Sequence, residues 1–183
     1  MEREYILKAG ETPAYAFVPG HWPHPERSPD GHSYGKMPLA ICADRPESWL
    51  KRKEWWLAVA LFDAGYYWEA HEVWEAFWVA SPRGEDHRSL LGGLIQVAAA
   101  AVKARQTHEE QGSRLLLRAL SKWDTISTSA VLGWEIAKLR SYCDRARDEI
   151  LEGTFDPKSR VQRVYSGLLA RCLTDEASSS SDT

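Results

Sequence analysis

The sequence predicts an all-α fold, a compact bundle of about five to six helices with an irregular Pro/Gly-rich N-terminal arm. Several long stretches repeat apolar residues at the spacing of an amphipathic helix. No stretch of convincing length alternates apolar and polar residues as a half-buried strand does. The connections between the helical stretches are short, which favours antiparallel neighbours and hence a bundle.

The chain of 183 residues, 44% of them hydrophobic, fits one domain with a sizeable core. We expect this helical domain at 46–173, after an arm at 1–45 and before a polar, acidic, disordered tail at 174–183. Prolines recur through the arm and exclude a helix there. The arm also carries large aromatic side chains, so we expect it to pack across the domain.

The helices are expected at the following ranges, in chain order: 46–65, 67–80, 85–105, 108–123, 134–153 and a short sixth at 161–172. Pro46 suits a first helical turn, and Gly65 suits a helix end. The range 90–102 is apolar nearly all round, which predicts that the third helix is central and buried.

Composition limits the class of function. A formal net charge of -3 gives no support for nucleic-acid binding. Three scattered cysteines indicate free thiols in a reducing compartment. No signal-peptide pattern and no membrane-spanning run is present, so we expect a soluble cytoplasmic protein that does not bind membranes. Nine tryptophans are consistent with a packed core or with a partner or self-association surface, so a homo-oligomer is one alternative.

The stretch GYYWEAHEVWEAFW at 65–78 concentrates the residues that carry chemistry. At 100° per residue, His71 and Glu75 lie one turn apart, inside an aromatic stripe that we expect to face the core. Glu72 then lies at the border of the stripe, and Glu69 faces solvent. A buried carboxylate must be paired, protonated or bound to a metal, so Glu75 needs a partner.

The third helix offers candidate partners. Arg88 and Gln96 lie on roughly one stripe, and Gly92 and Gly93 between them would let the second helix approach closely. The predicted site is a polar cluster covered by two tryptophans, with one glutamate at its rim: His71, Glu75, Arg88 and Gln96, with Trp74 and Trp78 above and Glu72 at the edge.

Three interpretations of this cluster compete. It is a buried network that fixes the register of two helices, a divalent-metal site, or a catalytic or ligand pocket. As a metal site it would use His71 and Glu75, with Glu72 or Glu69 adding an oxygen. As a pocket it would use His71 as acid or base oriented by Glu75, with Arg88 holding an anion. No second Glu/His pair exists at di-iron spacing, so we predict no cofactor, with a divalent metal as the alternative.

Other motifs are weaker. There is no Gly-rich phosphate loop and no HExxH zinc motif. His21, His24 and His32 in the arm match no zinc-ligand spacing, so we interpret them as parts of a packed, turn-rich segment.

The pattern His71-xxx-Glu75-xx-Trp78, within YYWEAHEVWE and before Arg88 and LLGGLIQVAAA, resembles the bacterial and archaeal family catalogued as domain of unknown function 309. The resemblance covers about residues 55–125 and includes GSRLLLRAL. It implies a compact all-helical domain and a functional role for His71, Glu75 and Trp78. It implies no activity.

These observations favour a binding or scaffold role, with a small molecule or a protein as the partner. The alternative is an enzyme that uses His71 and Glu75 as an acid–base pair or as metal ligands, such as a metal-assisted hydrolase.

Overall fold

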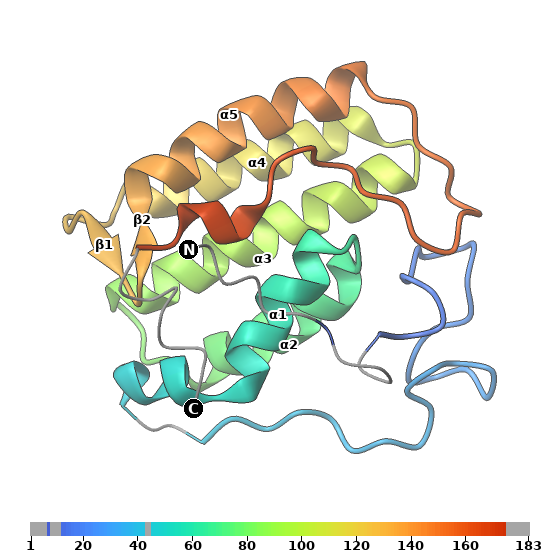
Figure 1. Cartoon of the computed structure of the whole chain (residues 1–183), viewed down its shortest axis with the longest axis horizontal. Coiled ribbons are helices and arrows are strands. Elements are labelled where there is room, and N and C mark those ends of the chain that lie inside the picture. Colours follow the sequence, from blue (N-terminus) through green and yellow to red (C-terminus); the bar gives the residue numbers. More distant parts are fainter. Residues whose placement is uncertain (1–6, 8–11, 43–44, 175–183) are drawn as a thin grey trace.

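The computed structural model describes residues 7, 12–42 and 45–174. In these ranges the chain forms five α-helices, two short 3-10 helices and one hairpin of two strands with two residues each. The all-α prediction is therefore confirmed (Figure 1). The elements in order are η1 (Pro46–Lys51), α1 (Lys53–Asp63), α2 (Tyr67–Ala80), α3 (Asp86–Arg105), α4 (Glu109–Trp123), β1 (Ala130–Val131), β2 (Trp134–Glu135), α5 (Ile136–Glu152) and η2 (Leu169–Cys172). The expected tail lies outside the described residues, except for Thr174.

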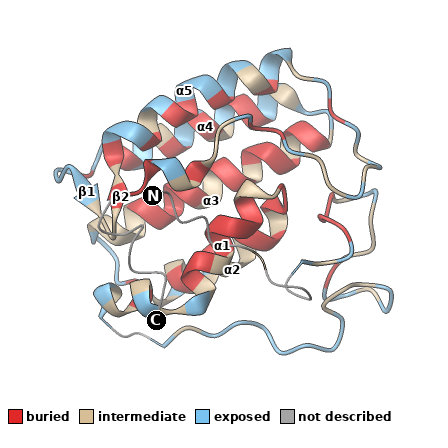
Figure 2. Ribbon diagram, in the orientation of Figure 1, coloured by how far each residue is buried: buried red, intermediate tan, exposed pale blue. Residues whose placement is uncertain are grey.

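Helix α3 is the centre of the molecule, as its apolar sequence predicts. It packs against α2 on one side and α4 on the other, and α4 in turn packs against α5 (Figure 1). Leu90, Leu91 and Leu94 of α3 have no exposed surface. Full burial of a leucine contributes roughly 1.5–3 kcal/mol, so this helix anchors the core (Figure 2).

The paired glycines of α3 face α4, so the expectation that they admit the second helix is wrong. A Cβ at Gly93 would lie 2.0 Å from Nε1 of Trp123. That indole nitrogen donates a hydrogen bond to the carbonyl of Leu90 at 3.1 Å. A glycine pair shows that some neighbour approaches closely, but not which one, and here the neighbour is the α4 tryptophan.

The first expected helix is divided in two. Arg52 adopts an extended conformation (φ -88°, ψ 133°) between η1 and α1. On one continuous helix Trp49 and Trp55 would point about 120° apart. The break instead lets both rings pack against Phe77, each with a centroid distance of 5.3 Å.

The expected sixth helix is also wrong, because only Leu169–Cys172 is helical in the range 161–172. The preceding segment runs as an irregular strap fastened by buried tyrosines. Tyr165 donates from its hydroxyl to the carbonyl of Val97 at 2.9 Å, and the amide of Val164 donates to the hydroxyl of Tyr67 at 2.8 Å. Long-range bonds of this kind replace the local bonds of a helix.

The hairpin between α4 and α5 was not expected from the sequence. Leu132 and Gly133 both have positive φ, 46° and 78°, as a tight two-residue hairpin turn requires. All three cysteines are free thiols, as expected, and Cys143 and Cys172 are buried. Among the described residues, no helix is both long and apolar enough to cross a membrane.

Candidate functional site

The core-facing side of α2 is rotated from the expected one. Its buried apolar side chains are Tyr67, Ala70, Trp74 and Phe77, whose mean direction on the helical wheel is about 80° from His71. Trp74 has no exposed surface and packs against Phe62, with ring centroids 5.5 Å apart, so it lies in the core and does not cover a polar site. Packing against α1 and α3 determines which of the aromatic side chains of α2 are buried. The sequence of α2 alone does not determine this.

His71 therefore lies at the edge of the buried face, and Glu75 is exposed. The expectation that Glu75 is buried within the aromatic stripe is wrong. Its carboxylate is solvated, so it needs no buried partner. The interpretation of His71 and Glu75 as part of a sealed network between helices loses its basis.

Three of the predicted site residues nevertheless lie close together on α2. His71, Glu72 and Glu75 each offer one ligand atom, and these atoms all lie within 4.8 Å of one another. Nδ1 of His71 is 3.3 Å from Oε1 of Glu72. That nitrogen is buried and has no hydrogen-bond partner among the described residues. The Trp68 ring stacks on the imidazole, with centroids 5.7 Å apart and an interplanar angle of 26°, and so orients it.

Arg88 lies elsewhere. Its guanidinium carbon is 3.8 Å from the centroid of the Trp78 ring. Its Nη1 donates to the carbonyl of Trp78 at 2.8 Å and to the carbonyl of Ser81. Arg88 and Trp78 thus close the C-terminal end of α2, where carbonyls lack helical partners. The expectation that Arg88 pairs with Glu75 is wrong, since no such ion pair exists in the described part of the chain.

Gln96 is half-buried on α3. Its Oε1 is buried and has no hydrogen-bond partner within the described ranges. Gln96 therefore makes no side-chain hydrogen bond to His71 or Glu75 through this oxygen, and the predicted four-residue cluster is not formed.

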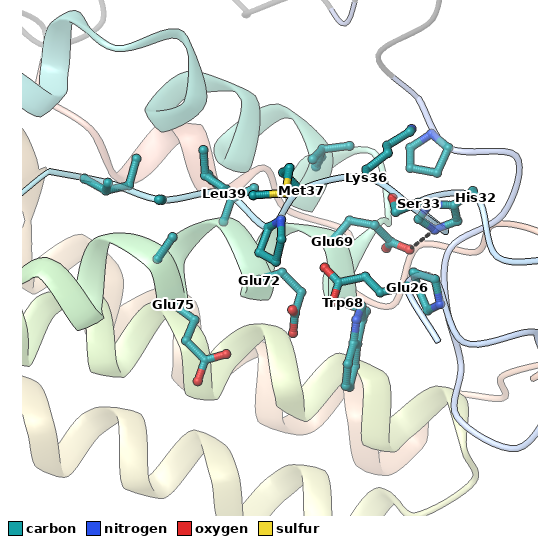
Figure 3. Close-up of a pocket in the computed structure, with 18 of the residues that line it drawn as sticks. Glu26, His32, Ser33, Lys36, Met37, Leu39, Trp68, Glu69, Glu72 and Glu75 are labelled. Atoms are coloured by element: carbon teal, nitrogen blue, oxygen red, sulfur yellow. Dashed lines mark hydrogen bonds and ion pairs between the residues drawn. The ribbon is translucent and has the colours of Figure 1, made fainter. Parts of the chain in front are cut away.

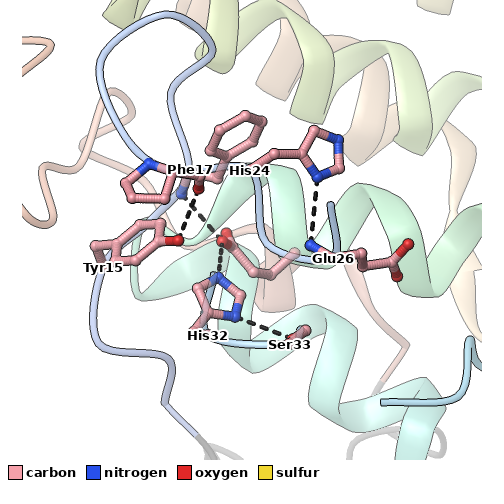
Figure 4. Close-up of polar contacts among 8 residues, drawn as sticks. Tyr15, Phe17, His24, Glu26, His32 and Ser33 are labelled. Carbon is pink, nitrogen blue, oxygen red and sulfur yellow. Dashed lines mark hydrogen bonds and ion pairs between the residues drawn. The ribbon is translucent and has the colours of Figure 1, made fainter. Parts of the chain in front are cut away.

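Glu69 is the residue that the helical wheel misplaced most. It is 8% exposed, where solvent exposure was expected. Its Oε1 accepts hydrogen bonds from the amide of Phe17 at 3.0 Å and from Nε2 of His32 at 3.0 Å (Figure 4). The N-terminal arm covers the face of α2 that points away from the core. The aromatic content of the arm was the signal that such a cover exists.

The Glu69 carboxylate acts on the neighbouring phenol groups. Burial first, and the charge of Glu69 second, raise the pKa of Tyr66 above its ordinary value. Burial is also the first cause, with Glu69 among the smaller ones, of the raised pKa of Tyr15. Both hydroxyls therefore stay protonated at neutral pH, and that of Tyr15 donates to the carbonyl of Pro23 at 2.7 Å.

A groove of about 800 Å³ lies between the arm and the outer face of α2 (Figure 3). Its acidic side chains are Glu26 from the arm and Glu69, Glu72 and Glu75 from α2. Lys36 and His32 are its basic residues, and its apolar wall includes Met37, Leu39, Ile41 and Val73. Glu72 and Glu75 belong both to this groove and to the group around His71, so the two features adjoin.

Residues 55–115 match the model of a family described as a domain of unknown function, DUF309. Over this segment the chain is similar to the DUF309 family. The DUF309 segment runs from α1 into α4 and contains every site residue that the sequence predicted. The arm lies outside the matched segment. A search of curated proteins finds no match to this chain.

Proposed function

We propose that this protein binds a divalent metal ion through His71, Glu72 and Glu75. The observation that carries the proposal is the convergence of one ligand atom from each residue within 4.8 Å. An imidazole nitrogen with carboxylate oxygens is a donor set that suits zinc, manganese or ferrous iron.

The surroundings of the three residues support this proposal. The buried Nδ1 of His71 has no other partner in the described residues, and Trp68 holds the ring in place. The side chains of His71 and Glu72 are 20% and 41% exposed, so both residues reach the protein surface. Three protein ligands leave at least one coordination position open, as in metal sites that bind a further molecule.

A second candidate function is metal-assisted hydrolysis. It is favoured by the position of Glu72 and Glu75, which line the groove as well as the ligand group. A divalent ion held there supplies Lewis-acid chemistry at the wall of a cavity large enough for a small molecule. A binding role remains the first proposal, because it requires only the ligand group.

The test is titration of the full chain, stripped of metal, with zinc, manganese and ferrous ions, followed by calorimetry and thermal unfolding. We expect one ion per chain and a higher Tm. At a free-ion concentration of about 100 times Kd, the stabilisation is about 2.7 kcal/mol.

Two variants and two controls locate the site. His71→Ala and Glu75→Gln should lose binding while remaining folded, because both side chains reach solvent. His108→Ala and Glu110→Gln remove the same kinds of group from exposed positions elsewhere and should bind as the parent does. A parent protein whose Tm responds to none of the three ions would refute the proposal.

A further inference from the structure

Glu69 has one carboxylate oxygen satisfied and one without a partner. Oε1 receives two hydrogen bonds from the arm. Oε2 is buried and has no hydrogen-bond partner among the described residues. Buried polar atoms in folded proteins are nearly always hydrogen-bonded, and an unpaired buried carboxylate oxygen is especially unfavourable. Oε2 therefore marks a position where a donor from outside the chain would be stabilised.

This carboxylate lines the groove between the arm and α2. Figure 3 shows Glu69 beside His32 at one end of the groove, with Glu72 and Glu75 further along α2. A length of six residues on a helix spans about 9 Å, so the acidic wall from Glu69 to Glu75 is as long as a short aliphatic chain.

The charged residues of the groove determine the sign of the charge that a bound ligand should carry. Four carboxylates line the groove, those of Glu26, Glu69, Glu72 and Glu75. Lys36 is the one lysine or arginine among the groove-lining residues that the structure describes. A cavity with this excess of carboxylates attracts cations and repels anions. Apolar side chains that line the same groove, among them Leu39 and Ile41, favour a ligand with an apolar body.

A metal ion is not the best occupant at Glu69. Among the described residues, the one group of three or more potential ligands is that of His71, Glu72 and Glu75, and Glu69 is not in it. An ammonium group instead brings three N–H donors and no acceptor, which matches a single unpaired carboxylate oxygen.

We propose that the groove between the arm and α2 binds a small organic ammonium ion with an aliphatic body. Its N–H donates to Oε2 of Glu69, and its carbon chain lies along the apolar wall beside Val73. The groove volume of about 800 Å³ is within the range of small-molecule sites. This site goes beyond the metal site, because its anchor is Glu69 and not His71.

The test uses the full chain, labelled with ¹⁵N, and three probes of equal length: hexylammonium, hexanol and hexanoate. We expect hexylammonium to produce saturable amide shifts in residues 32–41 and 68–80, with at least tenfold tighter binding than hexanol. Hexanoate should produce no saturable shift. Equal binding of the three probes, or tighter binding of hexanoate, would overturn the proposal.

Variants assign the interaction to Glu69. Glu69→Gln removes the charge but keeps an oxygen for the amide of Phe17, and it should weaken hexylammonium at least tenfold. Glu26→Gln, at an exposed position, should weaken it about threefold. Glu110→Gln on α4 changes the net charge equally and should have no effect.

The outcomes separate this site from the metal site. His71→Ala should lose metal binding and keep hexylammonium binding, whereas Glu69→Gln should do the reverse. If Glu69→Gln is folded and binds hexylammonium like the parent, the proposal is wrong. If that variant loses the native amide pattern of the arm, the probe comparison in the parent together with Glu26→Gln decides the matter.

Discussion

Nε2 of His32 lies 3.0 Å from Oε1 of Glu69 and joins positions 37 residues apart. The same oxygen receives the amide of Phe17. Two separate points of the arm thus meet on one carboxylate of α2. Glu69 is the anchor that holds the arm over the outer face of the helix and so forms the groove.

Replacement of Glu69 by alanine should therefore release the arm. The buried amide of Phe17 and the ring of His32 lose their acceptor, and hydrogen bonds to a charged group contribute about 1.5–3 kcal/mol. We expect a loss of about 2–3 kcal/mol in denaturant unfolding, with faster proteolysis between residues 19 and 30. Glu26→Ala, which removes an exposed carboxylate, should change stability by less than about 0.5 kcal/mol. Protease resistance equal to the parent's would contradict the anchoring role.

The two glycines of α3 should respond differently to alanine. At Gly93 the new methyl group meets the Trp123 indole at 2.0 Å, so α3 and α4 must move apart, at a cost of about 3 kcal/mol. At Gly92 the nearest atoms belong to the flexible side chain of Lys122, at 3.1 Å. Gly92→Ala should be neutral or stabilising by up to about 1 kcal/mol through helix propensity. Thermal unfolding of the two variants measures this difference. Equal changes in Tm would contradict the different surroundings described for the two glycines.

Arg88 should matter for stability and not for the metal. Arg88→Ala removes two hydrogen bonds to the end of α2 and the contact with the Trp78 ring, so we expect a loss of about 1–2 kcal/mol. Arg88→Lys keeps the charge but not the planar guanidinium group, so it should recover only part of the lost stability. Metal affinity in both variants should equal the parent's. Reduced metal affinity in folded Arg88→Ala would show that Arg88 belongs to the site.

His87 should make the protein less stable in mild acid. Burial lowers the pKa of its imidazole, while Glu85, Glu47 and Asp86 oppose that shift. The folded state then binds the proton less readily than the unfolded state, so stability is present above the unfolded pKa of about 6.5 and falls as the pH drops below it.

Unfolding measured from pH 7.5 to 5 should show this slope in the parent and a flatter one in His87→Phe, which keeps a ring against Trp49. His108→Gln, at an exposed position, should leave the slope unchanged. A slope as steep in His87→Phe as in the parent would assign the effect to another group.

The sequence predicts α2 to α5 to within a few residues because these helices are bounded by local signals. Apolar periodicity marks their length, and the turn at Ser81–Gly84 separates α2 from α3. The break at Arg52 and the strap before η2 have no local signal of that kind. They depend on how the buried side chains of Trp49 and Tyr165 pack in the core. That packing is a property of the assembled bundle.

The site divides in the same way. His71, Glu72 and Glu75 are neighbours on one helix, so their spacing lets one ligand atom of each come within 4.8 Å of the others. The sequence named them as the alternative ligands. Tertiary structure decided which side of α2 faces the core, because packing with α1 and α3 chose among its aromatic residues. It also gave Glu69 its partners, because a helical wheel describes one helix and cannot include an arm that returns from 37 residues away.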